Sequence, residues 1–109
     1  MSWPERFSPQ AIRDVEAAVD WLAGHGGDQV ARHMALATVA AGRRVVDRPL
    51  IGRVRLDLLP ARFRMWPGFP YLLVYDVDSS PVQIVRVLHM ARDFPSLLAG
   101  IADPGDAAS

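Results

Sequence analysis

The chain has 109 residues, half of them apolar, a formal net charge of zero and no cysteine. This size fits one compact domain and leaves no room for a second. Without cysteine there is neither a disulfide framework nor a thiolate metal site. No signal peptide and no apolar run approaching about 20 residues is present, which predicts a cytosolic protein that does not cross a membrane. We expect one domain over residues 1–102 and a flexible tail over 103–109.

Positive charge is concentrated in the middle of the chain. Residues 48–92 hold seven arginines against three carboxylates, and all 12 basic residues of the protein are arginine. A guanidinium group is a planar, permanently charged fork that suits carboxylates and phosphates. The cluster consists of Arg53, Arg55, Arg62 and Arg64. We expect it either to face an acidic partner or a nucleic acid, or to form a solvated and internally paired surface.

The N-terminal part predicts a short edge strand followed by a helix. Residues 3–7 suit an edge strand, where Pro4 is tolerated. Ser8 is a good N-cap and Pro9 fits the first helical position, so a helix is predicted over residues 9–23. Its apolar stripe consists of Ile12, Val15, Val19 and Leu22.

A second helix is predicted after the glycine-rich break at residues 24–27. Asp28 is its expected cap, and the helix must end before Pro49. Arg43 and Arg44 suit the negative end of its dipole. Its apolar stripe consists of Val30, Met34, Ala37, Ala41 and Val45. Two helices joined by so short a break are expected to pack as an antiparallel hairpin.

The C-terminal half predicts a sheet. Residues 49–60 read as an extended connector, and residues 61–66 as a strand that points Arg62 and Arg64 outward. Pro67-Gly68 has the composition of a type II turn, which would join this strand to the next.

Two further strands are predicted over residues 71–77 and 82–88, separated by turn residues 78–81. The first is apolar on both faces, as expected for a central strand. A short helix starting at Asp93 or Ser96 and running through Ile101 would follow. The predicted fold class is therefore α+β: an N-terminal edge strand, an antiparallel helical hairpin, a three-strand antiparallel meander and a short C-terminal helix.

Four stretches together resemble one known family: FSPQAIRDVEAAVDWLAGHG, PLIGRVR, RFRMWPGFPYLLVYDV and IVRVLHMARD. Their order and spacing are similar to the ParE branch of the RelE/ParE superfamily, the toxins of type II toxin-antitoxin modules. The resemblance implies one of two activities. RelE-type members cleave mRNA in the ribosome, whereas ParE-type members poison DNA gyrase with no known catalytic reaction of their own.

The candidate catalytic residues help to choose between these activities. Cleavage of RNA needs a base, an acid and cations around the phosphorane, and arginine supplies the cations alone because it does not deprotonate. The RelE-type site resembles a set of lysines and a C-terminal tyrosine, but this chain has no lysine and no tyrosine after Tyr75. His89 remains for proton transfer, with Arg64, Arg86 and Arg92 as the clamp.

The resemblance thus favours gyrase inhibition and leaves open whether the protein is an enzyme. A ribosome-dependent endoribonuclease is the alternative, and a non-toxic module that binds an antitoxin is a third reading. Each candidate also has a purely structural role: His89 could satisfy a backbone carbonyl, Arg86 could pair with Asp76 or Asp93, and Arg92 could pair with Asp93. No cofactor is expected, and His25 and His33 have no ligands at metal spacing.

A partner also follows from the resemblance. The antitoxin of such a pair carries a disordered C-terminal segment that folds onto the toxin. We expect an acidic, amphipathic segment to contact residues 53–64 and the apolar edge of the helical hairpin, through Arg53, Arg55, Arg62, Arg64 and Trp66. Trp66 either anchors that interface or closes a minor core. DNA gyrase is the expected target, and direct binding of nucleic acid is left open.

Overall fold

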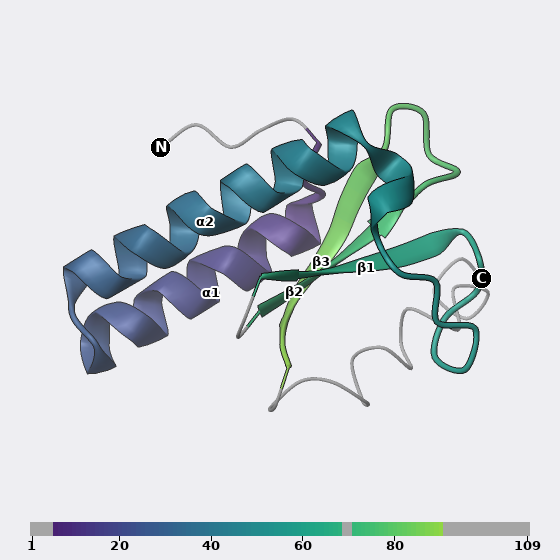
Figure 1. Ribbon diagram of the computed structural model, residues 1–109. Helices are drawn as coiled ribbons and strands as arrows, with labels where there is room; N and C mark the ends of the chain where they lie inside the picture. The colour runs from purple at the N-terminus through teal and green to yellow at the C-terminus, as the bar shows by residue number, and fades with distance from the viewer. Residues whose placement is uncertain (1–5, 69–70, 91–109) are drawn as a thin grey trace.

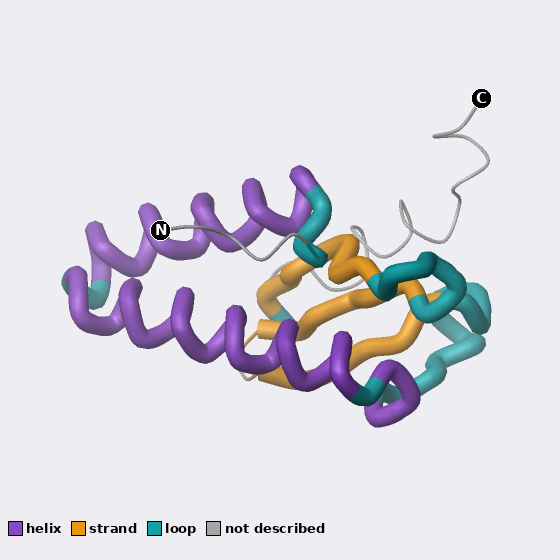
Figure 2. The backbone as a smooth tube through the Cα atoms, turned by 90° about the horizontal axis from the view of Figure 1, so that it is seen from above, coloured by secondary structure: helices purple, strands orange, loops and turns teal. Residues whose placement is uncertain are grey.

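A helical hairpin lies across one face of a three-stranded antiparallel sheet (Figures 1 and 2). The computed structural model describes residues 6–68 and 71–90. Helices α1 and α2 span Pro9–His25 and Asp28–Asp47, the short 3-10 helix η1 spans Pro49–Ile51, and strands β1, β2 and β3 span Phe63–Gly68, Tyr71–Asp76 and Gln83–His89. The strand order is β1-β2-β3. The predicted α+β class, the hairpin and the meander are confirmed.

The two helices begin differently. The Ser8 hydroxyl oxygen accepts a hydrogen bond from the Ala11 N–H at 3.1 Å, so the predicted cap of α1 is confirmed. The prediction that Asp28 caps α2 is wrong. Gly27 occupies the cap position with φ 95°, a conformation that favours glycine, and Asp28 is the first helical residue. There its carboxylate still lies near the positive end of the helix dipole.

The buried face of α2 differs from the predicted stripe. Val30, predicted to be buried, is 47% exposed, and Ala37 is exposed as well. The residues that α2 buries are mostly small: Ala31, Met34, Ala35, Thr38, Gly42 and Val45. Small side chains let the helix backbone come close to neighbouring elements. This close approach determines which face of α2 is buried.

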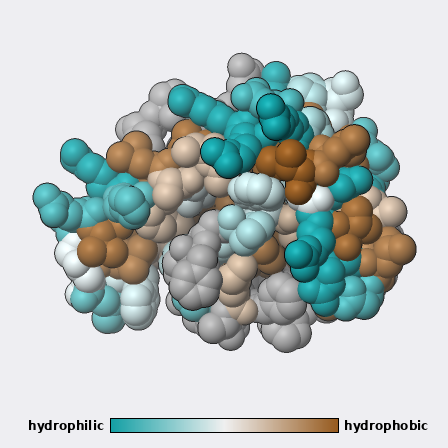
Figure 3. Space-filling model, viewed as in Figure 1, coloured by the Kyte–Doolittle hydropathy of each residue, from teal (hydrophilic) through white to brown (hydrophobic). Residues whose placement is uncertain are grey.

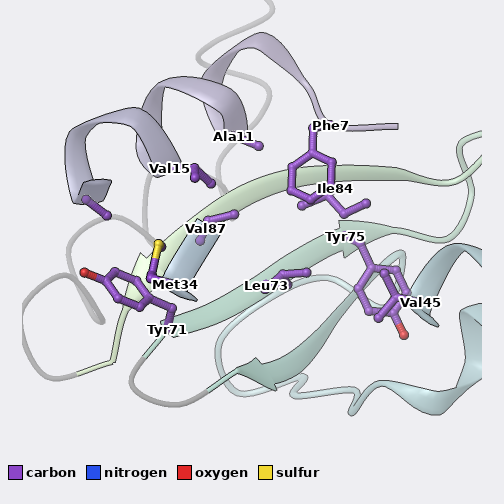
Figure 4. Packing of buried hydrophobic residues seen from close by; sticks show 11 residues of the cluster. Phe7, Ala11, Val15, Met34, Val45, Tyr71, Leu73, Tyr75, Ile84 and Val87 are labelled. Carbon is purple, nitrogen blue, oxygen red and sulfur yellow. The ribbon is translucent and has the colours of Figure 1, made fainter. Parts of the chain in front are cut away.

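The sheet is covered on both faces. Between the helices and the sheet lies the main core, formed by Phe7, Ala11, Val15, Ala18, Met34, Val45, Tyr71, Leu73, Tyr75, Ile84 and Val87 (Figure 4). A second cluster on the other face consists of Leu59, Phe63, Met65, Leu72, Val74 and Leu88. Every residue of β2 is buried, which confirms that it is a central strand.

Two predictions about the segments around β1 are wrong. Pro67 pairs with Leu72 and Gly68 with Tyr71, so β1 continues through the predicted type II turn. The ladder with β2 extends this far because Pro67 lies in an outer strand, where the N–H that proline lacks is not required. The connector is not simply extended. After η1 it contains an isolated antiparallel bridge between Arg53 and Met65 and a turn in which Leu58 and Leu59 donate to the Arg55 carbonyl.

The outer edge of β3 is covered by the segment before α1. Phe7 forms a parallel bridge with Ile84, whose N–H donates to the Arg6 carbonyl at 2.7 Å. The Ser8 N–H in turn donates to the Ile84 carbonyl at 2.9 Å. The N-terminal edge strand is therefore seen at Phe7. Residues 3–5 of that prediction, the C-terminal helix over 93–101 and the tail over 103–109 lie outside the described residues.

Candidate functional site

An apolar hollow with arginines beside it lies along β1 at the edge of the sheet. Its volume is about 430 Å³. We call it the connector hollow, and its lining residues are Ile51, Arg53, Arg55, Met65, Trp66, Pro67, Leu72 and Met90. Three of the predicted partner-binding residues, Arg53, Arg55 and Trp66, therefore come together here.

The backbone bridge to β1 positions Arg53. Its N–H donates to the Met65 carbonyl at 2.8 Å, and the Met65 N–H donates back at 2.9 Å. The side chain of Arg53 is exposed and forms no ion pair with any residue that the structure describes. A free guanidinium group beside apolar side chains suits a carboxylate carried on an amphipathic segment.

Arg55 already has a local partner. Its Nε and Nη2 atoms donate to the Asp57 carboxylate at 3.0 and 2.7 Å, and both side chains are well exposed. The hydrogen bond from Arg55 lowers the pKa of the Asp57 carboxyl, and the same bond raises the pKa of Arg55. Because exposed pairs contribute little, another carboxylate could replace Asp57 at Arg55.

Tyr75 and Arg64 hold the connector against the sheet. The Tyr75 hydroxyl donates to the Pro49 carbonyl at 2.7 Å and accepts from the Gly52 N–H at 2.8 Å. Arg64 Nη1 donates to the carbonyls of Leu50 and Gly52 at 3.2 and 2.9 Å. Burial raises the pKa of the Tyr75 phenol, although the Gly52 hydrogen bond and the nearby Arg64 charge partly offset this.

The prediction that Arg62 and Arg64 point outward together is wrong for Arg64. Arg64 is opposite Tyr75, on the helix-facing side of the sheet, and its Nε atom is buried with no hydrogen-bond partner in the described part of the chain. Arg62 is exposed and donates to both oxygens of Asp76, at 3.2 and 2.7 Å. The hydrogen bond with Asp76 raises the pKa of Arg62. Neither arginine lines the connector hollow.

Arg86 is held by a carboxylate that the sequence did not indicate. Its Nε and Nη2 atoms donate to Asp14 of α1 at 2.8 and 2.9 Å, and the Val87 N–H donates to the same carboxylate at 2.9 Å. The predicted pairing with Asp76 is therefore wrong, since Asp76 pairs with Arg62 instead, and the alternative partner Asp93 lies outside the described residues. Nothing in the sequence pattern marks Asp14, because 72 residues separate it from Arg86.

The nuclease candidates do not converge on one point. His89 is opposite Tyr71 on β2, with the two rings in an edge-on contact at 5.3 Å. Arg64 is opposite Tyr75, which lies four residues from Tyr71 along β2. The two tyrosine positions are therefore about 13 Å apart. These two candidates also lie on different sides of β2, in the outer strands. Arg92 lies outside the described residues.

Within the described ranges, no group of three His, Cys, Asp or Glu residues could hold a metal ion. None of the described helices is long and apolar enough to cross a membrane. The features that stand out are thus a hollow with arginines at its rim and a connector fixed to the sheet beside it. The shape and chemistry of this surface suit a segment that carries both apolar side chains and carboxylates.

Comparison with known proteins identifies the family. The family model described as "ParE toxin of type II toxin-antitoxin system, parDE" matches residues 6–94, so the chain belongs to the ParE toxin family. A solved structure titled "Chromosomal ParDE TA system from P. aeruginosa" is similar in fold, with a TM-score of 0.65 and 19% sequence identity. The match covers 76% of this chain and 90% of that one. A search of the curated proteins finds no match.

Proposed function

We propose that this toxin inhibits DNA gyrase in the cytoplasm and is neutralised by a cognate antitoxin whose acidic, amphipathic segment occupies the connector hollow. The observation that carries the proposal is the match to the ParE family over residues 6–94. Gyrase is the target expected of the ParE-type branch. The separation of Arg64 from His89 across the sheet supports the same choice, because ribonuclease chemistry needs its groups around one phosphate.

The connector hollow supports the antitoxin part of the proposal. Met65, Leu72 and Trp66 offer apolar surface, and Arg53 and Arg55 lie beside it. A segment that alternates apolar side chains and carboxylates would bury the former in the hollow and pair the latter with the arginines. The helical hairpin offers further apolar contacts, because Trp21, Val30 and Leu36 are about half exposed.

A direct test of the target is a supercoiling assay with purified gyrase and relaxed plasmid. We expect the chain to inhibit supercoiling and the antitoxin to restore it. Cleavage of mRNA on the ribosome with no effect on gyrase would instead identify a nuclease. No growth defect on induction, combined with tight antitoxin binding, would identify the non-toxic binding module.

The docking surface is tested separately with the double variant Arg53→Gln/Arg55→Gln. Losing two charge-assisted contacts should weaken antitoxin binding about tenfold or more, and binding should depend less on salt. Calorimetric titration at two ionic strengths measures both effects. Arg13→Gln, an exposed arginine on α1, is the matched control. Equal affinity and salt dependence in the double variant and the control would place the antitoxin elsewhere.

A further inference from the structure

A second group of arginines lies at the C-terminal end of α2, outside the connector hollow. Arg43, Arg44 and Arg48 are all exposed and surround a shallow hollow of about 280 Å³ together with Ala40 and Asp47. We call Arg43, Arg44 and Arg48 the α2-end arginines. Hydrophilic side chains gather over this end of α2 in the space-filling view (Figure 3).

Among the described residues, none of the α2-end arginines has a carboxylate partner, although Asp47 lies in the same hollow. Ala40 and Arg44 are four residues apart on one side of α2, and Arg48 follows as its C-cap, with its N–H donating to the Arg44 carbonyl at 2.9 Å. The three neighbouring arginines repel one another, and the negative end of the helix dipole offsets this repulsion in part.

The chemistry of the lining distinguishes two kinds of partner. A protein interface needs apolar anchors at its centre, whereas the phosphate backbone of a nucleic acid is bound by arginines with no apolar contact. In the described part of the chain, the hollow between the α2-end arginines is lined by one apolar residue, Ala40. The connector hollow, by contrast, is lined by Trp66, Leu72 and Met90.

We infer that the α2-end arginines form a binding surface for the phosphate backbone of a nucleic acid, without regard to its base sequence. Each guanidinium group would donate two hydrogen bonds to phosphate oxygens. Neutralising three phosphates releases condensed counterions, so binding should weaken steeply as salt rises. This activity does not depend on the gyrase proposal and is separate from antitoxin docking in the connector hollow.

The test is fluorescence anisotropy of a labelled mixed-sequence DNA duplex, titrated with the full chain at several salt concentrations from about 50 to 200 mM. Replacing all three residues, as Arg43→Gln/Arg44→Gln/Arg48→Gln, should reduce the slope of log K against log salt by about 2.7. The double variant Arg44→Gln/Arg48→Gln should reduce it by about 1.8. The control is Arg13→Gln/Arg32→Gln, two exposed arginines elsewhere on the helices, which should retain most of the slope.

Circular dichroism melting of each variant shows whether the fold is retained, and the graded double variant separates loss of contacts from loss of structure. Wild-type protein that does not bind DNA at the lowest salt would overturn the inference. So would equal slopes for the triple variant and the control. Polyglutamate serves as a polyanion without phosphate. Binding of polyglutamate as tight as that of DNA, lost in the same variants, would assign the surface to an acidic protein instead.

Discussion

At the scale of single residues, Asp14 is the carboxylate that joins α1 to β3. It accepts hydrogen bonds from Arg86 and from the Val87 N–H, and the side chains of Arg86 and Asp14 are only 17% and 10% exposed. We predict that Asp14→Ala lowers the free energy of unfolding by about 2–3 kcal/mol, because it leaves a largely buried guanidinium group without its carboxylate. Urea denaturation measures this change.

Asp20→Ala is the matched control, since Asp20 is an exposed carboxylate on the same helix. Its effect should stay within about 0.5 kcal/mol. If both variants changed the free energy of unfolding equally, the contact between Asp14 and Arg86 would not stabilise the protein.

Tyr75 makes stability depend on pH in the alkaline range. Burial raises the pKa of its phenol in the folded state above the ordinary value of about 10. The folded state therefore resists deprotonation, and this contribution to stability is fully present below about pH 10 and is lost as pH rises through the folded-state pKa. We predict that the free energy of unfolding falls above about pH 10, more steeply in the wild type than in Tyr75→Phe.

Tyr75→Phe also loses the hydrogen bonds to Pro49 and Gly52, which should lower the free energy of unfolding by about 1–2 kcal/mol near neutral pH. Urea unfolding at a series of pH values measures both effects. Parallel pH profiles for Tyr75→Phe and the wild type would show that the phenol does not contribute to the alkaline loss.

At the scale of elements, Gly42 allows α2 to pack closely on the chain before α1. A Cβ atom at this position would lie 2.6 Å from the ring of Phe7, which is itself buried. In a free helix, replacing glycine with alanine stabilises by about 1 kcal/mol. Here we predict that Gly42→Ala lowers the melting temperature, because overpacking costs about 1–3 kcal/mol.

Gly24→Ala provides the comparison. Gly24 also lies in a helix, but a Cβ atom there would meet no atom within 4 Å. This variant should raise the melting temperature slightly, through the higher helix propensity of alanine. A Gly42→Ala protein as stable as Gly24→Ala would mean that Phe7 moves aside without cost.

At the scale of the whole molecule, the spread of the candidate residues predicts how toxicity responds to mutation. His89 lies at one end of β3 and Arg64 opposite the other end of β2, beneath the connector. We therefore expect His89→Gln to inhibit gyrase as strongly as the wild type and cellular mRNA to stay intact during induction. Supercoiling assays and RNA electrophoresis from induced cells measure the two outcomes. Loss of toxicity together with loss of mRNA cleavage in His89→Gln would identify a nuclease.

Local chemistry made much of the fold predictable. The Ser8 cap and Pro9 mark the start of α1, the glycines after it mark the break of the hairpin, and the apolar runs mark β2 and β3. Each of these signals acts over a few residues, so neighbours in sequence suffice to read it. Arg53 and Arg55 also lie close to each other in the chain and line the same hollow, and their binding of a partner stays a prediction.

By itself, the sequence predicted the two long helices, the three strands of the sheet, their order and the resemblance to the ParE family, because these depend on local propensity and spacing. The tertiary structure decided which partner each arginine has. Arg86 pairs with Asp14, Arg62 with Asp76, and Arg64 binds the carbonyls of the connector. Any carboxylate or carbonyl could satisfy a guanidinium group, so the choice depends on which distant segments the fold brings within hydrogen-bond distance. That choice leaves Arg53 unpaired at the connector hollow and the three α2-end arginines unpaired at the end of α2, within the described part of the chain.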